Sequence, residues 1–144
     1  MHNIKLERCW ADPVVDFYEL CITCSNDQIT ASAMECWASN EIIDDLSFKI
    51  QKYSQKEISE FEWQIGNFEL NGLSEVTFKV LPTDKFGYLY IQIDMKIYDS
   101  TNLNCQSGIC TLNIQTEIGL LETFGKRISK LKERENNIIV SLVN

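Results

Sequence analysis

The chain of 144 residues has the length of one domain, because its halves would be too small to bury a stable core. It carries 13 Lys and Arg against 21 Asp and Glu, a formal net charge of −8. No apolar run approaches the roughly 18 residues that a membrane span needs, and the N-terminus lacks the apolar core of a secretory signal. We therefore expect a single domain, residues 1–144, that works in the cytoplasm and not in a membrane.

The charge is unevenly distributed. Residues 1–122 hold 8 basic and 19 acidic side chains, a net charge of −11, whereas residues 123–144 have a net charge of +3. Nucleic acid is a poor partner for such an acidic body, because binding to it relies on Lys and Arg that neutralise phosphates. An acidic surface favours encounter with basic proteins, or it serves solubility alone.

The first half of the chain predicts a β-hairpin followed by a helix. Apolar and polar residues alternate over residues 17–24, turn residues follow, and residues 28–37 continue as a second strand. Ser39 or Asn40 can cap a helix that extends to Tyr53. Its apolar stripe at helical spacing consists of Ile42, Ile43, Leu46, Ile50 and Tyr53.

The second half repeats this order after two further strands. Residues 60–65 and 75–80 alternate, residues 88–98 alternate most regularly, and residues 107–115 form the partner strand. Thr116 is expected to cap a second helix, with Glu117 in its first turn and an apolar stripe as far as Leu131. The segment 138–143 is a closing strand, a loose tail or a dimer contact.

Residues 17–53 and 88–131 thus look like two copies of one β-β-α unit, alike in pattern and not in sequence identity. Each strand has one apolar face and each helix one apolar stripe, so neither copy buries its apolar surface alone. The sequence therefore predicts an α+β fold: an antiparallel sheet built from two β-β-α units with extra strands between them, and two helices packed on the sheet.

The cysteines do not form a recognisable metal site. Cys21 and Cys24 make a CxxC motif, but residues three apart on a strand point to opposite faces, so their sulfurs do not converge. Cys105 and Cys110 are arranged more permissively, and a four-cysteine site from both pairs is the alternative. Buried free cysteine is the better interpretation, so we expect neither a metal site nor a cofactor.

Standard catalytic arrangements are missing as well. The one histidine, His2, lies in a terminus that we expect to be mobile, so it is poorly placed to act as a base or ligand. Asp44 and Asp45 are adjacent on the first helix and point about 100° apart, which is typical of a solvated helix start. None of the six glycines forms a phosphate-binding loop. The sequence indicates a protein that is not an enzyme.

Two surfaces are candidates for partner binding. The polar face of strand 88–98 carries Tyr88, Tyr90, Asp94 and Tyr98. Tyrosine is enriched at interfaces, although ordinary cross-strand aromatic pairing explains the same pattern. Trp10 has the same two interpretations, of which a plug over one end of the core is the default.

The second surface is acidic. If the first helix packs beside the third strand, six carboxylates merge into one patch; otherwise they are separate solvated faces. These residues are Glu41, Asp44, Asp45, Glu57, Glu60 and Glu62.

The segments FYEL with the following Cys21-Ile22, FGYLYIQI at 86–93 and CTLNIQTEIGLLETFGKRISKL at 110–131 resemble a family of small bacterial proteins. The pattern is similar to that of WapI-type immunity proteins of polymorphic toxin systems. This resemblance implies a cytosolic protein that blocks a cognate toxin by binding it, with a basic toxin domain as the partner and no catalytic residues. The alternatives are a homodimeric scaffold and a small-ligand-binding domain.

Overall fold

The structure, a computed structural model, describes residues 1–67, 74–98, 107–133, 135 and 137–143, without the side chains of Tyr98 and Ser107. Strands and helices follow one another along these residues in the order that the sequence predicts, with one unpredicted strand added at the N-terminal end. The elements are β1 (Asn3–Ala11), β2 (Tyr18–Ser25), β3 (Thr30–Ala38), α1 (Asn40–Ser54), β4 (Phe61–Gly66), β5 (Glu75–Val80), β6 (Tyr88–Tyr98), β7 (Ser107–Glu117), α2 (Ile118–Arg127), the 3-10 helix η1 (Ile128–Lys132) and β8 (Ile139–Ser141).

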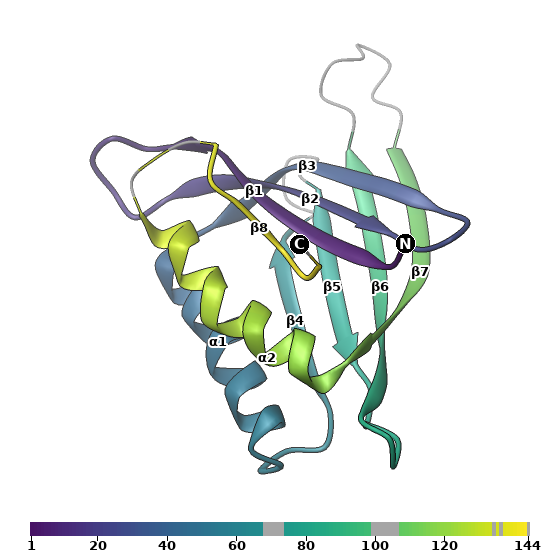
Figure 1. Cartoon of the computed structure of the whole chain (residues 1–144). Coiled ribbons are helices and arrows are strands. Elements are labelled where there is room, and N and C mark those ends of the chain that lie inside the picture. Colours follow the sequence, from purple (N-terminus) through teal and green to yellow (C-terminus); the bar gives the residue numbers. More distant parts are fainter. Residues whose placement is uncertain (68–73, 99–106, 134, 136, 144) are drawn as a thin grey trace.

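The strands form two antiparallel sheets of four strands each. Sheet A has the order β3-β2-β1-β8, and sheet B has the order β4-β5-β6-β7. Figure 1 shows α1 and α2 side by side, on the same side of sheet A as sheet B. The α+β class with helices packed on antiparallel sheet is confirmed. The strands divide between two sheets because α1 carries the chain away from the edge strand β3 before β4 begins.

Alternating apolar residues turn one face of each sheet toward a shared core. On β2 the buried residues are Tyr18, Leu20, Ile22 and Cys24, as the sequence predicts. On β4 Trp63 is 1% exposed; its indole N–H donates to the carbonyl of Ile42 at 3.0 Å, which joins α1 to sheet B.

Helix α1 begins where its cap predicts. The side chain of Ser39, and not that of Asn40, accepts from the backbone N–H of Ile42 at 3.4 Å. The helix packs against α2 at Gly125, where an added Cβ would meet Ile50 at 2.5 Å. The pair of helices is therefore closely packed at this point.

The N-terminal segment is a strand of sheet A, so the expectation of a mobile terminus is wrong. β1 pairs with both β2 and β8, and Ile4 and Leu6 are buried in the core. The alternation of inward-facing residues along β1 continues to Arg8, whose side chain is 3% exposed. Its guanidinium donates to the carbonyls of Leu131 and Glu133 at the end of η1, and lies 4.4 Å from the ring centroid of Tyr18.

The start of the second helix also differs from expectation. Thr116 does not cap it: this residue pairs with Leu89 as part of β7 and is 6% exposed. The strand continues to Glu117, which occupies the N-cap position of α2 without a side-chain hydrogen bond. Cross-strand pairing with β6 thus overrides the local capping preference of Thr116.

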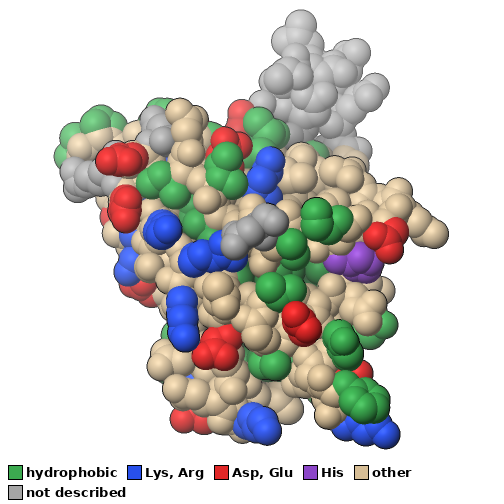
Figure 2. All heavy atoms as spheres, in the orientation of Figure 1, with side chains coloured by type: hydrophobic (Ala, Val, Ile, Leu, Met, Phe, Trp, Pro, Cys, Tyr) green, Lys and Arg blue, Asp and Glu red, His purple; other side chains and the backbone are tan. Residues whose placement is uncertain are grey.

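Of the three alternatives for residues 138–143, the closing strand is confirmed. Residues of β8 pair with β1 in an antiparallel register, from Lys5↔Ser141 to Glu7↔Ile139. Figure 2 shows Lys and Arg side chains over the α2–η1 side of the molecule, with acidic side chains between them. Four of the basic residues behind the charge reversal thus belong to the helical side of the molecule: Lys126 and Arg127 at the end of α2, and Lys130 and Lys132 on η1.

Candidate functional site

Three of the six predicted acidic residues lie along the seam between α1 and β4. Glu41, Asp44 and Asp45 line a groove of about 570 Å³ that also includes the exposed ring of Phe48. Two of these acids are paired with lysines, Asp45 with Lys49 at 3.0 Å and Asp44 with Lys132 at 2.7 Å.

The other three predicted acids do not line this groove. Glu62 lies on the outer face of β4, where its carbonyl accepts from Lys49 at 2.8 Å. Glu57 and Glu60 lie between the end of α1 and the start of β4, at the opposite end of the helix from Glu41. The six residues therefore follow the length of α1 and do not form one compact patch.

The predicted tyrosines occupy the outer face of sheet B. Tyr88 and Tyr90 are 47% and 49% exposed. Asp94 accepts a hydrogen bond of 2.8 Å from the hydroxyl of Thr111 on the neighbouring strand. The side chain of Tyr98 lies outside the described residues.

Sequence reasoning missed a third surface, on the outer face of sheet A. The aromatic cluster, which we define as Trp10, Phe17 and Trp37, lies at one end of β1, β2 and β3. The rings meet edge to face, with centroid distances of 5.9 Å for Trp10–Phe17 and 4.9 Å for Phe17–Trp37. Trp10 is 43% exposed and Trp37 is 40% exposed, so Trp10 is not a plug over the core.

A β-bulge places Trp10 on this outer face. Even-numbered residues of β1 point inward as far as Arg8, and an unbroken strand would turn residue 10 inward too. The register shifts between Arg8 and Trp10, because Cys9 is an extra residue without a partner on β2. Trp10 therefore pairs with Glu19 on the outer face, and Glu19 pairs with Trp37 on β3.

The surroundings of the aromatic cluster are acidic. We define the acidic rim as Glu7, Asp12, Glu19 and Glu35, which come from the same three strands and the β1–β2 loop. Asp16, in the same loop, is turned to the start of α1, where its carboxylate accepts from the backbone N–H of Asn40.

Glu19 lies between the two tryptophans. Burial raises the pKa of its carboxyl, and the charge of Glu35 raises it further. Lys5 is the cation of β1 on this face, since Arg8 points into the core. A docking partner would thus meet apolar rings framed by negative charge.

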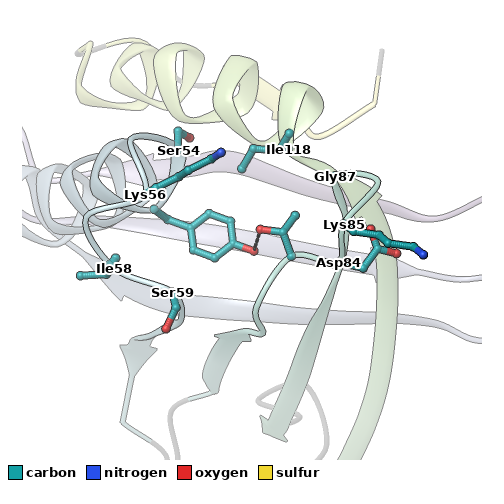
Figure 3. A pocket seen from close by; sticks show the side chains of 10 residues that line it. Ser54, Lys56, Ile58, Ser59, Asp84, Lys85, Gly87 and Ile118 are labelled. Atoms are coloured by element: carbon teal, nitrogen blue, oxygen red, sulfur yellow. Dashed lines mark hydrogen bonds between the residues drawn. The ribbon is translucent and has the colours of Figure 1, made fainter.

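A hollow of about 530 Å³ lies where the end of α1 approaches the β5–β6 connection and the start of α2. Figure 3 shows Ser54 and Lys56 on its α1 side, whereas Asp84 and Lys85 extend away from the other labelled side chains. The Tyr53 hydroxyl at this site donates to the carbonyl of Leu81 at 2.8 Å. These polar groups do not converge on one point, so the hollow gives little support to small-ligand binding.

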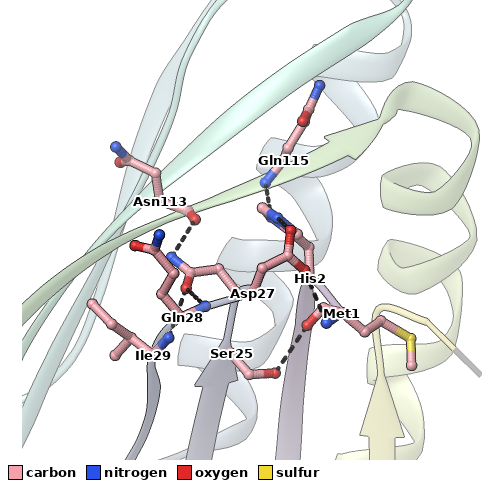
Figure 4. Close-up of polar contacts among 9 residues, drawn as sticks. Met1, His2, Ser25, Asp27, Gln28, Ile29, Asn113 and Gln115 are labelled. Carbon is pink, nitrogen blue, oxygen red and sulfur yellow. Dashed lines mark hydrogen bonds and ion pairs between the residues drawn. The ribbon is translucent and has the colours of Figure 1, made fainter.

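His2 is held in place and is not part of a mobile terminus. Figure 4 shows it between Asp27 and β7: its Nδ1 accepts from the backbone N–H of Gln115 at 2.8 Å, and its Nε2 lies 3.3 Å from the Asp27 carboxylate. Both ring nitrogens are engaged, which leaves neither free to act as a base.

The same contacts protect an edge strand. Asn26, in the β2–β3 turn, donates to the carbonyl of Asn113 on β7 at 3.2 Å. β7 is an edge strand of sheet B, so one side of its backbone has no partner strand. The hydrogen bond from Asn26 and the bond from Gln115 to His2 pair the Asn113 carbonyl and the Gln115 N–H on that side. His2 and Asn26 therefore have a structural role.

The predicted divergence of Cys21 and Cys24 is confirmed: Cys24 is buried in the core and Cys21 is partly exposed on the outer face. Cys105 lies outside the described residues. The structure nevertheless brings Cys21 close to Cys9 and Glu7, whose potential ligand atoms all lie within 4.8 Å of one another. Burial raises the pKa of the Cys9 thiol to about 11, with smaller contributions from Cys21 and Glu7.

Comparison of the chain with protein-family models, with curated proteins and with solved structures found no match. Among the described residues, no helix combines the length and apolar character needed to cross a membrane.

Proposed function

We propose that this protein acts in the cytoplasm by binding, without catalysis, a basic protein partner through its docking face, the aromatic cluster together with the acidic rim. The observation that carries the proposal is the exposure of Trp10 and Trp37, at 43% and 40%, on one sheet face. Tryptophan is enriched among the residues that dominate binding energy, because it buries a large rigid surface when a partner covers it.

Charge complementarity identifies the kind of partner. The four carboxylates of the acidic rim favour a surface in which Lys and Arg surround an apolar centre. Nucleic acid does not fit this face, since its phosphates would meet carboxylates. A basic protein also suits the net charge of −11 over residues 1–122.

A cognate toxin is the specific partner that we propose, and the protein would then be an immunity protein. The support is the resemblance in sequence pattern together with the charge: a nuclease toxin, for example, has a basic surface of its own with which to attract phosphate. An inhibitor that presents carboxylates around apolar rings would match such a surface.

A homodimer formed through the docking face is disfavoured by the same charge. In a two-fold contact the same patch faces itself, so the acidic rims of both copies would be juxtaposed. Light scattering over a concentration series should accordingly find a monomer at moderate ionic strength. A dimer that is abolished by Trp37→Ser would favour the scaffold alternative.

The direct test is to co-express the chain with the product of the gene next to its own. We expect a complex of the two proteins that weakens as salt increases, and protection of cells from that product. The matched variant Trp10→Ala/Trp37→Ala should lose both effects. If neither a complex nor protection is found with the unmodified chain, the proposed partner is wrong.

A further inference from the structure

Two irregularities of sheet A flank one cysteine. Cys21 lies on the central part of β2, and the β1 bulge at Cys9 is on one side of it. On its other side β3 carries a second register shift, at Met34 and Glu35, where the backbone of Glu35 has φ of 59°. A left-handed conformation is strained for a residue other than glycine, and bulges re-aim side chains next to functional sites.

The irregularities bring three sulfur atoms together on the outer face. The Cys21 Sγ lies 3.0 Å from the Sδ of Met34. The Cys9 Sγ and a Glu7 carboxylate oxygen lie within 4.8 Å of the Cys21 Sγ and of each other. Sulfurs that share a tetrahedral ion at about 2.3 Å stand about 3.8 Å apart. This value lies between the Cys21–Met34 separation of 3.0 Å and the 4.8 Å limit on the Cys9–Cys21 separation.

The ligand set selects the kind of ion. Thiolate and thioether sulfur are soft donors, which favour Cu(I) over harder cations such as Mg²⁺ or Ca²⁺. Zn²⁺ also takes thiolates, but it prefers a carboxylate or imidazole to a thioether as a further ligand. Cys9 is exposed and Met34 is 54% exposed, so an ion can reach the cluster from solvent.

We propose that Cys9, Cys21 and Met34, the sulfur cluster, bind one Cu(I) ion. On binding, the two thiols each release a proton to solvent and form Cu–S bonds, and the Met34 thioether donates a lone pair without a change in charge. The oxidation state of the metal and of the sulfurs does not change. Glu7 stands beside the site as a second negative charge. The site adjoins the docking face, since Glu7 also belongs to the acidic rim, but metal uptake is measured on the chain alone and so is tested separately from partner binding.

The test is an anaerobic titration of reduced protein with Cu(I) in competition with a chromophoric Cu(I) chelator. Thiol counting before metal addition should give the 6 cysteines of the sequence, which shows that Cys9 and Cys21 are not already joined in a disulfide. We then expect uptake of about one Cu(I) per chain, with a sulfur-to-copper charge-transfer band in the ultraviolet.

Substitutions assign the ligands. Changes to partners outside the first ligand sphere already weaken metal binding roughly 10–100-fold. We therefore expect Cys9→Ser and Cys21→Ser to abolish competitive uptake, and Met34→Leu to weaken it at least about tenfold. Cys110→Ser, in a partly exposed cysteine of sheet B, is the matched control and should leave uptake unchanged.

Three results would overturn the proposal. The first is no Cu(I) uptake by reduced protein whose thermal unfolding is normal. The second is equal loss of uptake in the Cys110→Ser control. The third is preferential Zn²⁺ binding that is weakened by Glu7→Gln and is not weakened by Met34→Leu. None of these results bears on partner binding, which is measured without metal.

Discussion

Among the residues that the structure describes, Arg8 is the one buried cation, and its position depends on the alternation of β1. Its guanidinium meets the carbonyl of Leu131 at 2.8 Å, at the end of η1, where positive charge is favoured by the helix dipole. A buried charge at this position is stabilising because it satisfies carbonyls that would otherwise be left without a donor.

We expect Arg8→Met to lower the free energy of unfolding by about 2–3 kcal/mol, since the carbonyls of Leu131 and Glu133 lose their donor. Urea denaturation measures this difference. Lys5→Met is the control on the same strand, because Lys5 points to the outer face and should change stability by less than about 0.5 kcal/mol. Equal effects of the two substitutions would contradict the role of Arg8.

Glu19 predicts a pH dependence. Because burial and the charge of Glu35 raise its folded-state pKa above the unfolded value, the ionised carboxyl is unfavourable in the folded protein. This penalty is present at neutral pH and disappears as the pH falls through the folded-state pKa. Glu19→Gln should therefore raise the thermal midpoint at neutral pH and lose this advantage in mildly acidic buffer. An advantage that grows as the pH falls would have the wrong sign.

At the scale of elements, the contact between α1 and α2 is decided by one glycine. Gly125 is buried against Ile50, whereas Gly119, six residues earlier in the same helix, has no atom within 4 Å of an added Cβ. Alanine is the better helix former by up to about 1 kcal/mol, so a loss of stability on replacing Gly125 by alanine reports packing and not helix propensity.

We expect Gly119→Ala to be neutral or stabilising by up to about 1 kcal/mol. Gly125→Ala should be destabilising by about 1–2 kcal/mol, because the new methyl group would lie 2.5 Å from Ile50 and the helices must separate. Chemical denaturation of both variants gives the comparison. A stabilising Gly125→Ala would mean that the helices are packed less closely than the structure indicates.

Elements whose residues alternate without interruption were predictable from the sequence. β2, β4, β5 and β6 turn the expected residues inward, because period-2 alternation with one buried face determines register. The start of α2 was not predictable, since the preference of Thr116 for a cap competes with pairing to Leu89 on a strand distant in sequence.

The docking face was not predictable from the alternation of residues, because β1 and β3 each contain a register shift. The extra residue at Cys9 reverses the direction of every later side chain of β1, so Trp10 turns from the core to solvent. Nothing in the local pattern of residues 3–11 marks this bulge. The signal that was available lies two residues away from each tryptophan. Trp63 has Phe61 and Ile65 at these positions, whereas the corresponding neighbours of Trp10 and Trp37 are polar: Arg8, Asp12, Glu35 and Ser39.

At the scale of the whole molecule, the two sheets present different outer faces. Sheet B exposes Tyr88 and Tyr90, while sheet A exposes Trp10 and Trp37 within the acidic rim. We propose that partner binding uses the outer face of sheet A, and neither the tyrosines nor the seam between α1 and β4.

Calorimetric titration with the product of the neighbouring gene, comparing two double variants, tests that claim most directly. Trp10→Ala/Trp37→Ala should weaken binding by at least about 30-fold, since one tryptophan at the centre of an interface already contributes about 2 kcal/mol and the effects of two need not add. Tyr88→Ala/Tyr90→Ala removes a similarly exposed aromatic pair from sheet B and should change affinity by less than about threefold. Tight binding by the tryptophan variant, with loss of binding in the tyrosine variant, would contradict the assignment of the docking face to sheet A.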